Sequence, residues 1–430
     1  MEQMNYASPL FVRSRRAYST QCMLEYFIAL LVSDAFLSKL LTVLGLSDAQ
    51  VGVISSLISA AFLFQLASVF LVDRIRRVKR CLLFFTTFSQ MLFASLYFLP
   101  FLNLPAALRQ PTVVCLLLLG YFCNYFVTTM VFQWGNSFVS PDLRGEFSAG
   151  KEMQSLLGGM IFTLLIGFMV DTLEARGQLM SAFLYIALIG LLTSAGNYIC
   201  IRRIGGREAL LSRPANAPRL REILRNTFGR REFRSLVVLT ALYNAALYLS
   251  TGFLGTYKLK ELALSVGAVQ LINIAANLCR FAVSRPMGRY SDRTSFARGA
   301  LLALCITAAG FALNIFAAPG AWFFAVLYTV LYAVGQAGLS QNMVNMAFNY
   351  VPVDYFVHAT AIKNSIGGIC GFTASLLGGW LLGRIQQNGN SLFGLHVYGQ
   401  QALSLLSFVL LCAAAIYTRA VIVPQKIMKQ

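Results

Sequence analysis

The chain has 430 residues, of which 57% are hydrophobic and only 12% charged, about half the charged share of an ordinary soluble domain. Its net charge of +19 comes from lysines and arginines in short stretches between apolar runs. That pattern lacks the basic, aromatic-bearing face of a nucleic-acid module. The composition therefore excludes an ordinary soluble domain and a nucleic-acid-binding protein, and it predicts a membrane protein.

Twelve apolar runs follow one another along the chain, each long enough to cross about 30 Å of hydrocarbon. Lipid cannot satisfy open backbone groups, and no alternating pattern indicates a barrel, so each run is expected to be a helix. We therefore predict an all-α polytopic membrane protein with twelve transmembrane helices. The predicted spans are Cys22–Leu44, Val51–Val72, Cys81–Leu102, Thr112–Val139, Met153–Val170, Met180–Ile201, Leu236–Tyr257, Val266–Ser284, Gly299–Ala318, Ala321–Tyr350, Ala359–Gly383 and Ala402–Val423.

A basic stretch divides the spans into two groups of six. We expect an N-terminal six-helix bundle over residues 1–201, a cytoplasmic linker over 202–235 and a C-terminal six-helix bundle over 236–430. Within the linker, Leu220–Phe228 has apolar residues at helical spacing among arginines, which predicts an amphipathic helix along the inner surface.

The basic residues also predict the orientation. If the amino terminus is inside, 27 of the 35 lysines and arginines are cytoplasmic and five are outside. Both termini are then cytoplasmic, and the first helix is an uncleaved insertion signal. The anionic inner leaflet would attract these loops, so the positive charge requires no further partner. We expect a monomer in a bacterial inner membrane.

A short charged motif occurs twice, after the second and the eighth spans. The first copy contains Asp73, Arg74 and Arg77, and the second, about half a chain later, contains Gly288, Asp292 and Arg293. Such an internal repeat is typical of duplicated transporters.

At these residues the chain resembles the major facilitator superfamily, whose loop between spans two and three reads roughly Gly-x-x-x-Asp-Arg/Lys-x-Gly-Arg/Lys. The chain departs from this motif at Val69 and Arg76, which replace its glycines. The resemblance covers all twelve spans and implies two pseudo-symmetric bundles. It also implies that the motif's aspartates and arginines form a cytoplasmic gating latch.

Five charged side chains fall within predicted spans, where each costs several kcal/mol unless it pairs or faces a polar cavity. A regular first span would place Glu25 and Lys39 on one side and Asp34 opposite. Either Glu25 or Asp34 is expected to face the cavity and carry protons. The five residues are Glu25, Asp34, Lys39, Arg280 and Lys363.

Polar residues also form stripes along several spans. The most regular stripe, in span eight, combines asparagines with an arginine expected to engage substrate or gate the cavity, with a salt bridge to Glu25 or Asp34 as the alternative. In the family that the chain resembles, spans one, four, seven and ten line the cavity. The stripe in span eight is Asn273, Asn277, Arg280 and Ser284, and the others include Asn124, Tyr125 and Thr128, Asn244 and Tyr248, and Asn342, Asn345 and Asn349.

No nucleotide-binding loop or paired metal-ligand spacing occurs in the sequence, so we expect neither an enzyme nor a cofactor or metal site. The leading hypothesis is a secondary active transporter that works by alternating access and couples protons to a small polar or anionic organic solute. The alternatives are efflux of amphipathic or cationic compounds and a non-transporting scaffold or receptor. The solute, the direction of transport and the coupling ion stay open.

Overall fold

The computed structural model describes residues 8–66, 78–136, 138–139, 144–205, 220–352, 355–392 and 395–425. In this part of the chain, eleven helices are long and apolar enough to cross a membrane. A bent pair, α1 (Pro9–Leu31) and α2 (Asp34–Val43), makes a twelfth span if the two are counted together. The predicted all-helical, multi-pass architecture is confirmed.

Large apolar side chains lie on the outer faces of these helices. Leu192, Trp380 and Ile416 each expose more than 60% of their surface. Side chains of this size on the faces of spanning helices are suited to contact with lipid tails rather than water. The structure therefore agrees with the composition: the outer faces of the spanning helices are suited to lipid.

The chain packs as two compact units. Unit 1 comprises Met1–Gly45 and Ala67–Ala217, and unit 2 comprises Leu46–Leu66 and Pro218–Gln430. The segment Leu46–Leu66 thus packs with residues that follow it by more than 150 positions. The predicted division of the chain into bundles over residues 1–201 and 236–430 stays a prediction.

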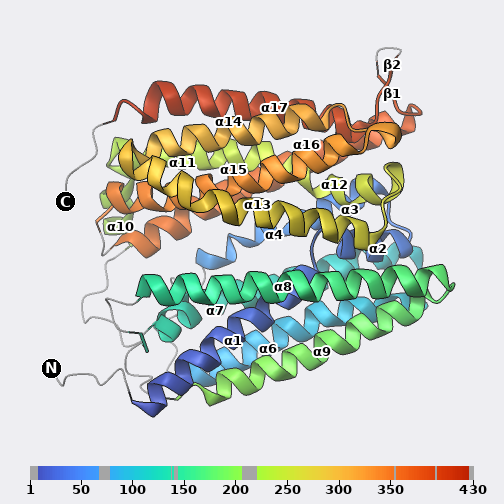
Figure 1. The fold of residues 1–430 in the computed structure, drawn as a ribbon, viewed down its shortest axis with the longest axis horizontal. Helices are drawn as coiled ribbons and strands as arrows, with labels where there is room; N and C mark the ends of the chain where they lie inside the picture. Colours follow the sequence, from blue (N-terminus) through green and yellow to red (C-terminus); the bar gives the residue numbers. More distant parts are fainter. Residues whose placement is uncertain are drawn as a thin grey trace. The chain divides into compact units, whose positions relative to one another are not determined.

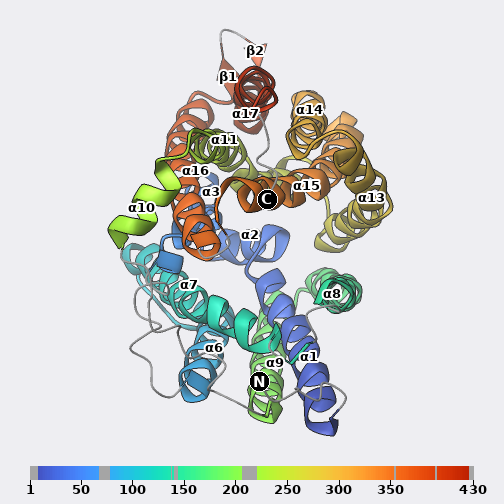
Figure 2. The same cartoon turned by 90° about the vertical axis from the view of Figure 1, so that its left-hand side faces the viewer.

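Unit 1 is built from long helices that pack side by side. In it α1 packs against α8 and α9, and α6 packs against α7 and α9 (Figure 2). An aromatic-rich core around the buried side chains of Tyr18, Trp134 and Phe138 joins α1 to α7. The further helices of unit 1 are α6 (Val78–Ser95), η2 (Leu96–Phe101), α7 (Ala106–Asn136), α8 (Arg144–Ala175) and α9 (Leu179–Arg203).

The first span is bent, so the expectation of one regular helix from Cys22 to Leu44 was wrong. The axes of α1 and α2 differ by 42°. Ser33 is extended, and Asp34 begins α2 with φ at +43°, a left-handed conformation that aspartate tolerates better than larger residues. The relative directions of Glu25 and Lys39 inferred from a straight helix are therefore wrong as well.

Unit 2 is also built from long helices that pack side by side. Its helix α17 lies between α11 and α14, α11 packs on α16, and α15 packs on α13 and α14 (Figure 2). A hairpin of two short strands follows α16 (Figure 1). The elements of unit 2 are α3 (Asp48–Ser55), α4 (Leu57–Ala61), α10 (Leu220–Phe228), α11 (Arg231–Tyr248), η5 (Thr251–Phe253), α12 (Leu254–Thr256), η6 (Tyr257–Glu261), α13 (Val266–Arg293), α14 (Phe296–Asn314), η7 (Pro319–Ala321), α15 (Phe323–Tyr350), α16 (Phe356–Gln387), β1 (Ser391–Leu392), β2 (Leu395–His396), α17 (Gly399–Tyr417) and η9 (Thr418–Ile422).

The sequence predicts a helix over Leu220–Phe228, and the structure has α10 with these bounds. Figure 2 shows α10 lying across the direction of its neighbours α11 and α16, which are seen nearly end-on. This direction is the one expected for a helix that lies along a surface and does not cross the membrane.

The early segment α3–α4 is fixed in unit 2 by close backbone approach and by charge. The Oγ of Ser59 donates to the carbonyl of Gly368 on α16 at 2.9 Å. At the start of α3, the Asp48 carboxylate accepts from Lys260 at 2.5 Å and from the Gln386 amide at 2.9 Å. Because Asp48 is 8% exposed and both its oxygens have donors, its charge is well compensated.

Candidate functional site

Glu25 on α1 lies among amide side chains in unit 1. Its Oε2 accepts a hydrogen bond of 2.7 Å from Nε2 of Gln21, one turn earlier, and its Oε1 accepts one of 3.1 Å from Nδ2 of Asn124 on α7. Thr128, the next turn of α7, donates to Oδ1 of Asn124 at 3.1 Å. A short polar network centred on Glu25 therefore joins α1 to α7.

The partners of Glu25 are neutral. Within the described residues no lysine or arginine forms an ion pair with this carboxylate. An amide offers both a donor and an acceptor, so Gln21 and Asn124 can bind a carboxylate and, after the amide rotates, a protonated carboxyl. The network can therefore accommodate both protonation states of Glu25, whereas a fixed cation would favour the charged one.

Other titratable side chains surround this network. Lys151 on α8 donates to the Tyr18 hydroxyl at 3.3 Å and lies 4.8 Å from the centre of that ring. The Cys22 thiol donates to the Gln21 side-chain oxygen at 3.5 Å. On α7, Tyr125 is partly buried, with its ring centre 6.3 Å from that of Tyr121. Gln21 was not among the predicted site residues, although its spacing of four from Glu25 was a usable signal, and Lys151 falls between the predicted spans four and five.

The other two charged residues of the first span lie beyond the bend. Asp34 is the first residue of α2 and is partly buried. The ammonium of Lys39 lies 2.5 Å from a carboxylate oxygen of Glu174 on α8, and both side chains are partly exposed. Lys39 therefore has its own counter-ion and does not extend the Glu25 network.

In unit 2, Asn244 and Tyr248 lie one turn apart on α11 and face α16 where that helix has glycines. A β-carbon on Gly367 would come within 2.9 Å of the Asn244 side-chain nitrogen, and one on Gly371 within 2.7 Å of the Tyr248 ring. The Asn244 amide also donates to the carbonyl of Thr240 at 2.8 Å. The predicted polar stripe of span seven thus lies in the α11–α16 seam, the line of contact between these two helices.

The predicted stripe of span eight lies on a continuous helix, α13. Its members Asn273, Asn277, Arg280 and Ser284 are all partly buried. The Ser284 hydroxyl donates to the backbone carbonyl of Arg280 at 2.7 Å. Within the described residues of unit 2, Arg280 forms no ion pair.

The asparagines of span ten differ in burial. Asn342 is 3% exposed, donates to the carbonyl of Gly338 one turn earlier at 2.8 Å, and packs against Gly299 of α14. Asn345 is partly buried. The environment of Asn342 is that of a side chain between two packed helices.

The two copies of the predicted gating motif are described unequally. Asp73, Arg74 and Arg77 lie outside the described residues. In the second copy, Gly288, Asp292 and Arg293 occupy the last turns of α13, and both charged side chains are exposed. The exposed carboxylate of Asp292 is thus accessible to another helix end.

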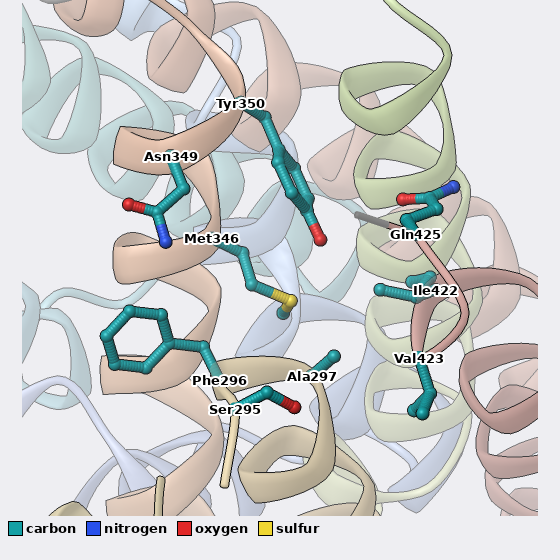
Figure 3. Close-up of a pocket in the computed structure, with 9 residues that line it drawn as sticks. All are labelled: Ser295, Phe296, Ala297, Met346, Asn349, Tyr350, Ile422, Val423 and Gln425. Atoms are coloured by element: carbon teal, nitrogen blue, oxygen red, sulfur yellow. The ribbon is translucent and has the colours of Figure 1, made fainter. Parts of the chain in front are cut away.

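A small pocket lies at the ends of α14, α15 and η9 (Figure 3). Its cavity volume is about 20 Å³, room for little more than one water molecule and far below that of a site for organic ligands, and none of its lining residues is charged. Met346 and Tyr350 project from α15 toward Ile422 on the opposite wall (Figure 3). We assign no function to this pocket.

Metal-dependent chemistry finds no support in the same part of the chain. In the described ranges no three His, Cys, Asp or Glu side chains come together as a metal site would require.

No protein-family model matches this sequence, and no curated protein matches it by sequence comparison. Solved structures do match over nearly the whole chain. A variant of the nucleoside transporter NupG superimposes with a TM-score of 0.75 at 14% identity, covering 95% of this chain and 99% of that one. An auto-inhibited peptide transporter of the POT family gives 0.69 at 11% identity, covering 97% and 98%.

A third match is a bacterial homologue of the human lysosomal transporter Spinster, with a TM-score of 0.60 at 14% identity over 97% of both chains. All three are membrane transporters with the major facilitator fold, and none is an enzyme. At such low identity the likeness concerns the fold alone. This chain therefore has the major facilitator fold, and the resemblance inferred from its repeated motif is confirmed at that level.

Proposed function

We propose that this chain is a secondary active transporter that works by alternating access and couples protons to the movement of a small polar or anionic organic solute. The fold supports the transport class, because the transporters of nucleosides and peptides described above share it. Broken or bent spans with polar residues near their breaks are a recurrent feature of transporters. The bend between α1 and α2 fits that pattern.

The single observation that carries the proton-coupling proposal is the environment of Glu25. Its carboxylate is partly buried, accepts from Gln21 and Asn124, and forms no ion pair in the described residues. A coupling carboxyl must bind and release a proton while it stays within the protein. Neutral amide partners allow this because they can bind either form.

Flux into proteoliposomes tests both parts of the proposal. A thermal-shift screen of sugars, carboxylates, amino acids and nucleosides first identifies a solute that raises the melting temperature, because a ligand that prefers the folded state stabilises it. We expect uptake of that solute to increase under an imposed pH gradient. Equal uptake with and without the gradient would refute proton coupling. If no stabilising solute is taken up, transport itself would be refuted.

The location and orientation are also proposals. We infer a bacterial inner membrane with both termini on the cytoplasmic side, because this orientation places most basic residues there. In that orientation α10 would lie at the inner leaflet, and the exposed Asp292 would be available for a cytoplasmic latch. Labelling of single cysteines placed at Arg176 and Arg225 by a membrane-impermeant reagent is expected to succeed from outside only at Arg176.

A further inference from the structure

Lys363 is a buried cation that the sequence analysis counted among the charged residues of the spans but assigned to no site. It lies on α16, where only 5% of its surface is accessible. Ala359, one turn earlier, is completely buried and belongs to the apolar core of unit 2. The lysine is therefore enclosed by protein in a region where a charge is costly.

The described residues offer no counter-ion for this ammonium. Across the described residues, no carboxylate forms an ion pair with Lys363 and no group accepts a hydrogen bond from it. A lysine near the end of a span often extends its side chain to the interface. Lys363 lies only seven residues after the start of α16, but with 5% of its surface accessible most of the side chain lies within the protein and not at the interface.

The position of Lys363 on α16 links it to the polar residues of α11. Positions 363, 367 and 371 recur at spacings of four, so they lie along one face of the helix. Gly367 faces Asn244 and Gly371 faces Tyr248. Lys363 thus occupies the α11–α16 seam one turn before the asparagine and two turns before the tyrosine.

We propose that Lys363 is the anion-binding residue of unit 2 and that it binds a carboxylate or phosphate group of the transported solute, with Asn244 and Tyr248 as the neutral polar part of the same site. A small oxyanion supplies both the counter-charge and the hydrogen-bond acceptors that the ammonium lacks. The assignment of this ligand to a transported solute rests on the proposed function. Binding of the oxyanion itself does not.

The test compares the melting temperature of the full-length protein in zwitterionic nanodiscs with paired probes: N-acetylalanine and its amide, and glucose 6-phosphate and glucose. We expect at least one anion to stabilise the wild type more than its neutral partner. Lys363→Met should weaken binding of that anion at least tenfold, and Lys363→Arg should retain part of it. Lys39→Met is the control, because it removes the same charge from a lysine already paired with Glu174.

Melting temperatures measured without added probes test directly whether the Lys363 ammonium has a counter-ion. Lys363→Met should melt at a higher temperature than the wild type, because an apolar side chain of similar length replaces a cation without a partner. A lower melting temperature would indicate an existing counter-ion and overturn the proposal. No preference of the wild type for either anion over its neutral partner would overturn it as well.

Two further experiments are needed. One distinguishes a lipid headgroup from a soluble anion as the ligand, and the other tests the Lys363 site separately from the transport function. If phosphatidylglycerol nanodiscs stabilise the wild type over Lys363→Met while soluble anions do not, the residue binds lipid and the assignment to a solute is wrong. If the wild type transports an anionic solute and Lys363→Met does so with the same rate and KM, the Lys363 site fails while transport stands. If anion binding depends on Lys363 but no solute flux is found, the proposed Lys363 site is supported and the proposed transport function is refuted.

Discussion

The two units hold their intramembrane charges in different ways. In unit 1 the Glu25 carboxylate accepts hydrogen bonds from the amides of Gln21 and Asn124, so its oxygens have partners without any cation. In unit 2 only 5% of the surface of Lys363 is accessible, and its ammonium has neither a counter-ion nor an acceptor among the described residues. The first group is satisfied by its own unit, and the second has no partner among the described residues.

This difference separates two kinds of transport residue. A carboxyl held by groups that are both donors and acceptors can change its protonation state in place. An ammonium without acceptors is stable in a closed site only when something else brings them. Unit 1 is thus suited to exchange a proton, and unit 2 is suited to bind an anion.

The largest effect is expected for Glu25→Gln, which removes the titratable group from the polar network of unit 1. The amide of glutamine has nearly the size of the carboxyl and can hydrogen-bond Gln21 and Asn124, but it cannot titrate. We expect solute uptake driven by a pH gradient to fall about a hundredfold or more, the usual contribution of a positioned proton-transfer group. Exchange of labelled for unlabelled solute without a gradient should persist.

Asp34→Asn is the matched control for this prediction, because it neutralises the other acid of the first span. Its gradient-driven uptake should stay close to that of the wild type. If Asp34→Asn lost coupling while Glu25→Gln kept it, the proton-carrying role would belong to Asp34.

A structural prediction tests whether the α11–α16 seam is closely packed at its polar residues. In Gly371→Ala the added β-carbon would lie 2.5 Å from the Ser59 hydroxyl and 2.7 Å from the Tyr248 ring, so the helices must shift. We expect a loss of about 1–3 kcal/mol of stability, the usual cost of overpacking, measured by thermal or denaturant unfolding in detergent.

Gly288→Ala provides the comparison on another helix. A β-carbon at Gly288 meets no atom within 4 Å, and alanine favours a helix over glycine by up to about 1 kcal/mol. This variant should be as stable as the wild type or more so. Equal losses in both variants would mean that the close contact at Gly371 is not what limits stability.

A smaller effect is expected from a charge that is paired within unit 2. Asp48→Asn removes the carboxylate that binds Lys260 and Gln386, and it should cost about 1–2 kcal/mol, since one hydrogen bond to a charged group is lost and Lys260 is partly exposed to solvent. The change has the opposite sign to that expected for Lys363→Met. Unfolding of the two variants under identical conditions would show whether paired and unpaired charges in unit 2 differ as proposed.

The matched surface pair is Lys39 with Glu174. Glu174→Gln should change stability by no more than about 1 kcal/mol, because both side chains are partly exposed. A cost larger than that of Asp48→Asn would contradict the ranking of the two ion pairs by burial.

The sequence was sufficient to predict the helices but not their directions. Apolar length predicts a span whatever its neighbours are, so hydropathy identified the spans of the described chain, and the helical spacing of apolar residues identified the helix at Leu220–Phe228. Ser33 and Asp34 are two polar residues within an apolar run, and nothing in hydropathy separates a tolerated polar pair from a break. The bend that they introduce was therefore missed, and with it the environment of Lys39.

The candidate site was predictable only where its contacts are local. Gln21 and Glu25 are four residues apart on one helix, so their contact follows from helix geometry. The hydrogen bond from Asn124 spans 99 positions and depends on how α1 and α7 pack. Lys363 likewise became informative only when the glycines beside it showed which face of α16 meets α11. A single sequence does not contain these pairings.

The membership of α3–α4 in unit 2 also bears on how the protein is made. The contact between Ser59 and Gly368 joins residues 309 positions apart, and translation adds about 5–20 residues per second. After the early segment has been synthesised, roughly 15 to 60 s pass before its binding surface on α16 emerges from the ribosome. During that interval, Asp48 and Ser59 lack the partners that satisfy them in the finished fold. Docking of α3–α4 into unit 2 therefore has to wait until late in translation, and a chain that stops before α16 leaves an early span without its partner.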